Sequence, residues 1–368
     1  MKTYKLKIKT KHQTYNLILG KNLMINLSKI LKNNFIFFEK CLLVIDKKVP
    51  KSILNKITFS LKKNKKIIYF FNSSEINKNQ KTVNQLLNIL LKNNFHRDDC
   101  IISIGGGITG DVSGFVASIF KRGIKFVNIP TTLLAQADAS IGGKTGINSN
   151  FGKNLIGTFA QPNLVISDTS FLNSLPNREV ICGYAEILKH SLILNKKLFI
   201  YLNKNGNQIL KLKSPFINQA IYKSCLIKKK IIEKDENETN VRKILNFGHT
   251  FGHAYEATMS YSKKLNHGEA VLLGIISASN FAYQNSYMDS KNYKKIINYF
   301  NKFNLPRNIN NFFSKKDIKK ILSFMLKDKK NKNEKINLIL LKKISKVNYN
   351  KLFEKNEIYK FFNKELIN

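Results

Sequence analysis

Apolar and polar residues alternate with two different periods along this chain, and the period changes near its middle. In the first half, short apolar runs bounded by glycine, asparagine or proline indicate buried strands, and stretches with apolar residues at helical spacing lie between them. The strands are predicted at 3–10, 14–20, 41–46, 66–71, 100–107, 125–132 and 163–168, and the helices at 22–35, 47–64 and 82–94. This alternation predicts a parallel sheet covered by helices on both faces.

The second half is dominated by helical periodicity. Helices are predicted at 177–194, 218–239, 242–262 and 268–288, with one strand at 336–344. We therefore expect an α/β protein of two domains. A Rossmann-like parallel-sheet N-terminal domain of residues 1–175 would be followed by a mostly α-helical C-terminal domain of residues 176–368, with the boundary near the turn at 169–179.

The chain length, cysteines and termini narrow the class of protein. A chain of 368 residues suits two domains of about 150 residues each. Its four cysteines are far apart and form no CxxC pair, which favours reduced thiols and a cytoplasmic location. The N-terminus lacks the apolar segment of a signal peptide, and no uncharged apolar stretch reaches the length of about 18 residues that favours a membrane span.

The formal net charge of +40 suggests a nucleic-acid-binding protein as a rival class. The lysines, however, are spread along the whole chain and accompany abundant asparagine and isoleucine. AT-rich codon usage explains this pattern better than a basic binding face does, because nucleic-acid binders tend to gather their charge on one face. We expect no nucleic-acid or membrane partner, and a salt-dependent DNA-binding assay would decide between the two explanations.

A glycine-rich turn follows the predicted strand at 100–107, and a helix is expected to begin near Gly110 and Asp111. Glycines allow a close approach of the backbone to a pyrophosphate, and the start of a helix offers free N–H groups. Strand, turn and helix together favour a nucleotide site, although a plain strand–helix connection has the same pattern. Asp111 could bond a ribose or a substrate hydroxyl, or cap the helix.

The segment that follows carries hydroxyls and cations. Thr131 and Thr132 come directly after a predicted strand, and Lys144 and Lys153 lie in a glycine-rich stretch. Lysines in such a loop suit a phosphate or carboxylate, but a solvated loop in a lysine-rich protein is an equal alternative. The stretch is not a complete phosphate-binding P-loop, because Ala139 stands where that motif requires glycine.

Histidine is scarce, with six residues, yet His249, His253 and His267 lie close together in the sequence. On a helix, His249 and His253 share a face, and His267 can return to them after a loop. A catalytic zinc takes three nitrogen or oxygen ligands and keeps one position open, and Glu186 on an earlier predicted helix is a further candidate ligand. The HTFGH segment is not the HExxH motif, so it does not indicate a zinc protease. His190 and Glu269 are competing ligands.

Arg242, Asn246, His249 and His253 are spaced by four, three and four residues, which predicts that one helical face presents all four. Such a face suits a polyhydroxylated acid or a phosphate. The alternative for Arg242 is a surface salt bridge with Glu238, and the alternative for Lys228 is an ordinary exposed lysine.

Several motifs between about residue 100 and residue 330 together resemble those of the 3-dehydroquinate synthase family of the shikimate pathway. They are GGGITGD, KRGIKFVNIPTTLLAQADASIGGKTGIN, GKNLIG, YAEILKH, DENET, RKILNFGHTFGHAYEA, NHGEAV and LKDKK, in the order in which the family has them. The resemblance implies that NAD binds the N-terminal domain, that Zn²⁺ or Co²⁺ binds the helical domain, and that the protein is a homodimer.

The resemblance also implies roles for individual residues. The metal ligands fall on Glu186, His249 and His267. The NAD contacts fall on Glu75, Lys78, Gly107, Gly110, Asp111, Thr131, Thr132, Lys144, Lys153, Phe171 and Ser174. The catalytic and substrate-binding positions fall on His253, Lys144, Lys189, Lys228, Arg242, Asn246, Asp138, Asn154 and Lys329, and on Arg122, which in the family reaches the phosphate across the dimer interface. The sequence departs from the family at Ser73–Ser74 and at Asn237.

The implied reaction converts 3-deoxy-D-arabino-heptulosonate 7-phosphate to 3-dehydroquinate and phosphate. It proceeds through transient oxidation by NAD, phosphate elimination, re-reduction and an aldol cyclisation. A metal-dependent polyol dehydrogenase is the nearest rival, but a neutral polyol does not require the set of Lys144, Lys228 and Arg242. A sugar phosphate cyclase for another substrate, such as an inosose synthase, shares more of these features.

Overall fold

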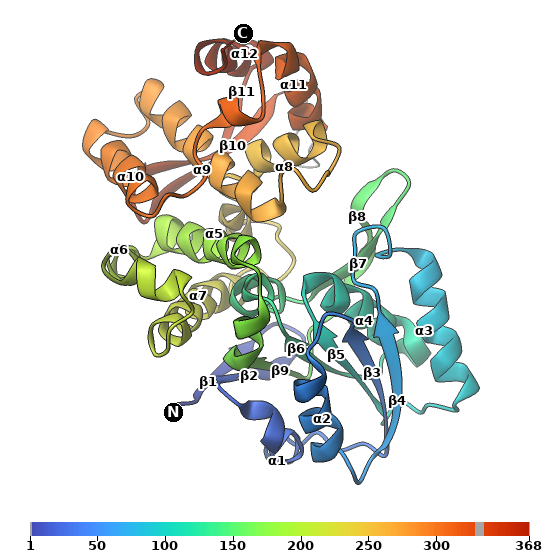
Figure 1. The fold of residues 1–368 in the computed structure, drawn as a ribbon. Helices are drawn as coiled ribbons and strands as arrows, with labels where there is room; N and C mark the ends of the chain where they lie inside the picture. The colour runs from blue at the N-terminus through green and yellow to red at the C-terminus, as the bar shows by residue number, and fades with distance from the viewer. Residues whose placement is uncertain (1, 328–334, 368) are drawn as a thin grey trace. The chain divides into compact units, whose positions relative to one another are not determined.

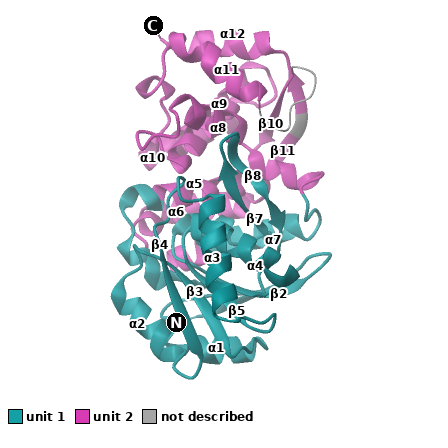
Figure 2. Cartoon of the chain, turned by 90° about the vertical axis from the view of Figure 1, so that its right-hand side faces the viewer, with its two compact units in different colours: residues 1–180, 221–237 teal, residues 181–220, 238–368 magenta. Residues whose placement is uncertain are grey.

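The computed structural model describes residues 2–327 and 335–367, and the chain forms two compact units. The first unit comprises residues 1–180 and 221–237, and the second comprises residues 181–220 and 238–368 (Figure 2). The sequence suggested a single boundary after residue 175, whereas the structure returns a later segment to the first unit. That segment includes the second half of helix α7 (Phe216–Ile232), where the thiol of Cys225 donates to the carbonyl of Gln136 at 3.3 Å.

The first unit is built on a seven-stranded sheet with the order β1-β2-β9-β6-β5-β3-β4 (Figure 1). The pair β1 and β2 is antiparallel, and the other neighbouring pairs are parallel. The strands are β1 (Tyr4–Lys9), β2 (Thr14–Gly20), β3 (Lys40–Asp46), β4 (Lys65–Phe71), β5 (Cys100–Gly105), β6 (Lys125–Pro130) and β9 (Leu164–Asp168). The predicted parallel sheet is therefore confirmed.

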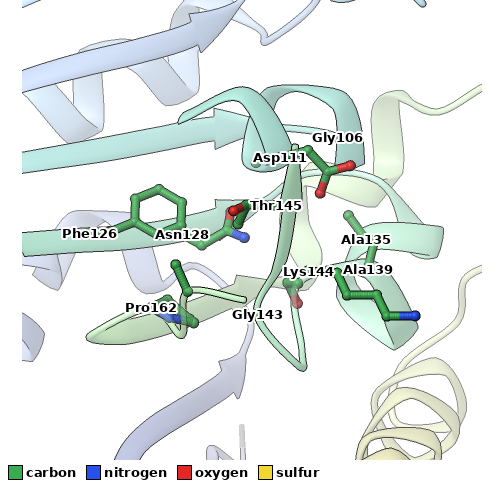
Figure 3. Close-up of a pocket in the computed structure, with 14 residues that line it drawn as sticks. Gly106, Asp111, Phe126, Asn128, Ala135, Ala139, Gly143, Lys144, Thr145 and Pro162 are labelled. Atoms are coloured by element: carbon green, nitrogen blue, oxygen red, sulfur yellow. The ribbon is translucent and has the colours of Figure 1, made fainter. Parts of the chain in front are cut away.

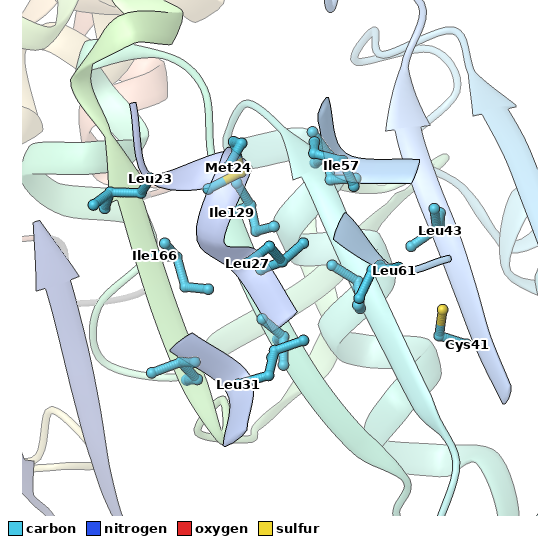
Figure 4. Packing of buried hydrophobic residues seen from close by; sticks show 14 of the residues in the cluster. Leu23, Met24, Leu27, Leu31, Cys41, Leu43, Ile57, Leu61, Ile129 and Ile166 are labelled. Carbon is cyan, nitrogen blue, oxygen red and sulfur yellow. The ribbon is translucent and has the colours of Figure 1, made fainter. Parts of the chain in front are cut away.

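Helices cover both faces of this sheet. They are α1 (Leu27–Asn33), α2 (Lys51–Ser60), α3 (Gln80–Lys92) and α4 (Gly107–Ile119). Leu43 and Ile45 of β3 pack with residues of α1 and α2 (Figure 4), and the alternate residues Leu42 and Val44 pack with residues of α3 and α4. Because helices cover both faces of the sheet, consecutive residues of β3 are apolar, and the strand shows no alternation of apolar and polar residues. Burial of each such side chain contributes about 1.5–3 kcal/mol.

The glycine-rich segment after β6 has regular structure that the sequence pattern did not reveal. A short π-helix (Ala135–Ala139) precedes an antiparallel hairpin of β7 (Lys144–Ser149) and β8 (Gly152–Phe159). The periodicity missed the hairpin because its strands are polar and glycine-rich. A 3-10 helix (Thr169–Ser174) then follows β9.

The second unit is mostly helical, and the predicted fold class is confirmed. Among the described residues, no helix has the length and apolar character needed to cross a membrane. The helices are α5 (Asn177–Leu194), α6 (Lys196–Leu210), the start of α7, α8 (His249–Thr258), α9 (His267–Gln284), α10 (Ser290–Lys302), α11 (Ile318–Leu326) and α12 (Lys355–Glu365), with an antiparallel hairpin of β10 (Ile336–Lys343) and β11 (Lys346–Phe353). Shorter 3-10 helices lie at Val241–Asn246, Ile309–Asn311 and Lys315–Asp317.

Candidate active site

The first unit contains the predicted strand, glycine turn and helix. Strand β5 ends at Gly105, and a Cβ there would lie 2.4 Å from Oγ1 of Thr109, so only glycine fits. The start of α4 borders a pocket, which the first residues of β7 also line (Figure 3). Its lining includes Gly106, Gly107, Gly110, Asp111 and Lys144. The free N–H groups at the start of α4 suit a pyrophosphate at this pocket.

A buried lysine connects three of the predicted residues beside this pocket. Lys78, in the loop between β4 and α3, is only 4% exposed. Its Nζ donates to Oδ2 of Asp111 and to Oδ1 of Asn154, both at 2.5 Å. Burial raises the pKa of Asp111 above its ordinary value, and the charge of Lys78 opposes that rise. The tertiary structure thus gathers groups from a loop, a helix and a strand into one polar cluster.

Two further predicted residues tie the same loop to the hairpin. The carboxylate of Glu75 accepts a hydrogen bond from Nδ2 of Asn148 at 2.8 Å. Nζ of Lys153 lies 3.7 Å from the other carboxylate oxygen of Glu75. The loop that contains Glu75 and Lys78 is therefore held against β7 and β8, next to the pocket.

The other residues predicted for the nucleotide site lie at the ends of β6 and β9. Thr131 and Thr132 follow β6, and the N–H of Thr131 donates to Gly105 at 2.9 Å. The ring of Phe171 belongs to the buried core of the sheet, so its main chain is the part that can face a ligand. The hydroxyl of Ser174 donates to the carbonyl of Phe171 at 2.9 Å, one turn along the same 3-10 helix.

Lys228 is not an ordinary exposed lysine. It is 6% exposed, and its Nζ lies 2.7 Å from Oδ1 of Asp138 and 2.7 Å from the carbonyl oxygen of the same residue. Both residues belong to the first unit, since this part of α7 packs there. The ammonium of Lys228 is therefore a buried charge that Asp138 holds in place.

The predicted metal ligands come together in the second unit. Glu186 of α5, His249 of α8 and His267 of α9 each offer one ligand atom, and these atoms lie within 4.8 Å of one another. Oε1 of Glu186 is buried, accepts no hydrogen bond from the residues that the structure describes, and lies 3.5 Å from Nε2 of His249. Two imidazoles and one carboxylate are a donor set that Zn²⁺ accepts, and Co²⁺ binds such nitrogen and oxygen ligands too. The residues therefore fit a divalent metal.

In both histidines of this group, Nδ1 contacts an oxygen atom of another residue. Nδ1 of His249 lies 3.3 Å from the carbonyl oxygen of Phe247, and Nδ1 of His267 lies 2.9 Å from Oε2 of Glu256. Burial lowers the pKa of His267, but the charge and hydrogen bond of Glu256 outweigh this effect and raise the pKa above its ordinary value. Nε2 of His249 lies on the side of Glu186, 3.5 Å from its Oε1, where a metal would be bound.

Glycines bring α8 and α9 close enough for these ligands to meet. A Cβ at Gly274 would lie 2.0 Å from the carbonyl oxygen of Gly248 and 2.8 Å from the backbone nitrogen of Gly252. Gly248 itself has a φ of +78°, a left-handed conformation that strains other residues. The backbones of α8 and α9 are therefore in direct contact beside His249 and His267.

His253 lies beside the metal group but outside it. Its ring centroid is 5.1 Å from that of His249 and 6.1 Å from that of His267, and its side chain is exposed. A second group of possible ligands, His253, Glu256 and His267, shares one histidine with the first. In that group Glu256 already accepts from His267, so the group of Glu186, His249 and His267 is the better metal site.

The predicted single helix at 242–262 is wrong. A 3-10 helix (Val241–Asn246) ends before Phe247, and α8 begins only at His249, because left-handed Gly248 lies against α9 and interrupts the helix. Arg242 is 2% exposed, which is inconsistent with a surface salt bridge. Nδ2 of Asn246 donates to Oε1 of Glu238 at 2.6 Å. Arg242 and Asn246 thus belong to a different element from the two histidines.

The remaining predicted residues have varied surroundings. The ammonium of Lys189 pairs with Oε2 of Glu186, and both side chains are buried. Arg122 is exposed at the far end of α4 from the pocket, with a φ of +64°. Lys329 lies outside the described residues.

Two carboxylates beside these residues were missed by the sequence analysis. Glu238 contacts Asn246, and Glu256 contacts His267. Glu238 was considered only as a partner of Arg242, in the acidic DENET segment. Glu256 lies three residues after His253, and that helical spacing was the available signal.

Comparison with known proteins shows which family the chain resembles over most of its length. Residues 68–182 match the family model described as 3-dehydroquinate synthase N-terminal, and residues 183–331 match the one described as 3-dehydroquinate synthase C-terminal. A 3-dehydroquinate synthase from Pelagibacter ubique (strain HTCC1062) is 59% identical over 362 residues, which is 98% of both chains.

Solved structures share the fold. A 2-deoxy-scyllo-inosose synthase, complexed with carbaglucose-6-phosphate, NAD⁺ and Co²⁺, matches with a TM-score of 0.85 and 27% identity, covering 99% of this chain and 100% of the other. A 2-epi-5-epi-valiolone synthase from Streptomyces hygroscopicus subsp. jinggangensis 5008, with NAD⁺ and Zn²⁺ bound, matches in fold with a TM-score of 0.83 and 23% identity, covering 97% and 98%.

Proposed function

The chain belongs to the 3-dehydroquinate synthase family, and from this membership we propose which of its residues perform each part of the family's reaction. The substrate is 3-deoxy-D-arabino-heptulosonate 7-phosphate, and the products are 3-dehydroquinate and phosphate, so the enzyme is a phosphate-eliminating lyase of aromatic amino acid biosynthesis. The observation that carries the proposal is the group of Glu186, His249 and His267, in which the carboxylate is buried and which lies beside an exposed histidine.

Two cofactors have candidate residues here. Structural relatives contain NAD⁺ with Co²⁺ or Zn²⁺. We assign NAD to the pocket at the start of α4, with the cluster around Lys78 and Asp111, and a divalent metal to Glu186, His249 and His267. When bound, NAD supplies a hydride acceptor and donor, and the metal supplies a Lewis acid that acidifies a substrate hydroxyl.

The substrate carries a carboxylate and a phosphate, and we propose that buried cations bind both. Lys228 and Arg242 are 6% and 2% exposed, so an anion that reaches them meets charges that water screens little. Arg242 can hold such an anion by two parallel hydrogen bonds, whereas Lys228 and Lys144 act as point charges. Asp138 positions Lys228 by accepting from its ammonium at 2.7 Å.

Proton transfer falls to His253. Its exposed imidazole lies beside the proposed metal ligands without being one of them, and imidazole is the side chain that most often transfers protons in catalysis. Asn246, held by Glu238, and Lys189, paired with Glu186, are proposed to bind substrate oxygens. Asn154 is proposed to do so from β8. Elimination needs no strong base from the protein, because the leaving phosphate can take up the proton.

Phosphate release from the heptulosonate phosphate tests the activity. With NAD and Zn²⁺ supplied, we expect steady release of one phosphate for each molecule consumed, without accumulation of NADH, because the reaction returns its hydride. A chelator should stop the release, and added Zn²⁺ should restore it. Steady NADH formation would instead show a dehydrogenase, and turnover of a hexose 6-phosphate in place of the heptulosonate would show a cyclase of another specificity.

We also propose that the protein is a homodimer in which Arg122 serves the partner's site. The 13 residues of α4 extend about 20 Å, and Arg122 follows its C-terminal end while the pocket lies at its N-terminal end. Arg122 is not among the residues that line the pocket of its own chain. Near the same end, Ser118 of α4 lies 2.9 Å from Thr158 of β8, and that strand exposes 41–48% of Leu155, Ile156 and Phe159. An edge strand that exposes apolar side chains among its polar and glycine residues favours pairing with a second copy.

Subunit complementation checks the dimer. Arg122→Ala and His253→Ala should each be nearly inactive alone. After mixing, unfolding and refolding together, heterodimers should regain up to a quarter of the unmodified activity, because one of their two sites then has both residues intact. The same variants refolded separately and then assayed together serve as the control. Activity that stays absent in the co-refolded mixture would place Arg122 in its own subunit's chemistry.

We propose a cytoplasmic location. All four cysteines are buried free thiols, as expected in a reducing compartment.

A further inference from the structure

Glu256 makes a buried contact with one of the proposed metal ligands. It lies on α8, is 7% exposed, and its Oε2 is 2.9 Å from Nδ1 of His267 at the start of α9. A carboxylate is costly to bury unless it has a partner, and His267 is the partner that this geometry provides.

The contact determines which nitrogen of His267 is available. When a carboxylate accepts the Nδ1–H of an imidazole, the proton is held there and the lone pair resides on Nε2. His249 shows a weaker form of the same arrangement, since its Nδ1 lies 3.3 Å from a neutral carbonyl oxygen of Phe247. Among the described residues, Nδ1 of His267 contacts a carboxylate, whereas Nδ1 of His249 contacts a carbonyl oxygen. His267 also lies at the start of α9, which follows a loop.

We propose that Glu256 is the positioning residue that holds His267 in the orientation and tautomer required for metal binding. The proposal rests on the proposed metal site of Glu186, His249 and His267. The carboxylate of Glu256 accepts from Nδ1 of the imidazole and so fixes the orientation of the ring. The same hydrogen bond connects the start of α9 to α8. Glu256 does not itself bind the metal.

The alternative is that Glu256 is a ligand in the second group, with His253 and His267. The two roles exclude each other, because Oε2 of Glu256 and Nδ1 of His267 cannot hydrogen-bond to each other while both bind a metal. Glu256 is buried and already accepts from His267, so its use as a ligand in the second group would require this hydrogen bond to break.

Three substitutions of Glu256 distinguish a positioning residue from a metal ligand, because they change the length and the charge of the side chain separately. Glu256→Gln keeps an oxygen that can accept from Nδ1, Glu256→Asp keeps the charge but loses the reach, and Glu256→Ala loses both. The readout is the Kd of Zn²⁺, measured in the full chain by competition with a chromophoric chelator, together with the visible absorption spectrum of the Co²⁺ form. We expect the Ala and Asp variants to bind about 10–100-fold more weakly, and the Gln variant to lose less than either.

Ser277→Ala is the matched control, because the hydroxyl of Ser277 on α9 contacts that of Tyr255 on α8 at 2.7 Å, away from the ligands. It should lower thermal stability without changing the Kd of Zn²⁺. If Glu256→Ala does not fold, the comparison of Asp with Gln decides. Zn²⁺ binding by the Ala or Asp variant as tight as that of the unmodified chain would overturn the proposal. A Gln variant that loses as much as Ala, with a changed Co²⁺ spectrum, would identify Glu256 as a ligand. If the unmodified chain binds no Zn²⁺, the metal site itself fails.

Discussion

His249→Ala is expected to lose bound zinc and activity together, whereas His253→Ala loses activity and keeps its zinc. Nε2 of His249 faces Oε1 of Glu186 at 3.5 Å, so the substitution removes one of three ligands from a site that has no substitute within the same group. The metal is worth several kcal/mol to the transition state, so its loss lowers kcat by on the order of 10³-fold. Removing the general acid–base function of His253 costs about 10²- to 10⁴-fold.

Zinc content after dialysis, the Kd of Zn²⁺ and the rate of phosphate release distinguish the two variants. Added Zn²⁺ in excess should restore part of the activity of His249→Ala and none of that of His253→Ala. Equal loss of zinc from both variants would contradict the division of labour between the two histidines. It would then favour the second group, in which His253 is a ligand.

Gly274→Ala is expected to disrupt the metal site through the backbone, without removing any ligand. The new Cβ would lie 2.0 Å from the carbonyl oxygen of Gly248, and an ordinary contact needs at least 3.4 Å, so α8 and α9 must separate by about 1.4 Å. Overpacking of this kind costs about 1–3 kcal/mol or more. His249 and His267 come from the two helices that separate, and a displacement of about 1 Å at an active site can cost on the order of 10²-fold in rate.

Thermal unfolding with and without Zn²⁺ measures both effects of Gly274→Ala. The melting temperature should fall, and the increase produced by Zn²⁺ should shrink, because weaker binding stabilises the folded state less. Ser279→Ala is the control on the same helix, since the Ser279 side chain is buried and its hydroxyl bonds only to the carbonyl of Ile275 at 2.7 Å among the contacts described. Normal zinc affinity in Gly274→Ala would show that the two helices can separate without cost to the site.

Several strands and helices, and the cluster of histidines, can be predicted from the sequence alone. The apolar runs that become β3 and β5 are buried on both faces, so their composition had to be apolar throughout, and α5 begins and ends where its helical period does. Because histidine is scarce in this chain, the cluster of His249, His253 and His267 is conspicuous in the sequence alone. The family resemblance then divided their roles, which spacing left open.

Other structural features depend on contacts between segments that are far apart in the sequence, so the local sequence pattern does not predict them. The hairpin β7–β8 is polar and glycine-rich, so it has no strand periodicity to detect. Lys228 looks like a surface lysine in a lysine-rich helix until α7 is seen to bury it against Asp138. The predicted helix at 242–262 fails because Gly248 takes a left-handed conformation where its backbone contacts α9, and helical periodicity does not show where a glycine will do so.

Residue type and order were sufficient for the fold class, the glycine turn and the identity of the candidate ligands, because burial and helical period leave a direct trace in composition. The partners of those ligands required three dimensions. Glu256 reaches His267, and Glu186 reaches His249, only because α5, α8 and α9 pack together, and α8 and α9 do so across glycine contacts. A contact between helices depends on the distance between their axes, and the sequence of either helix alone does not contain that distance.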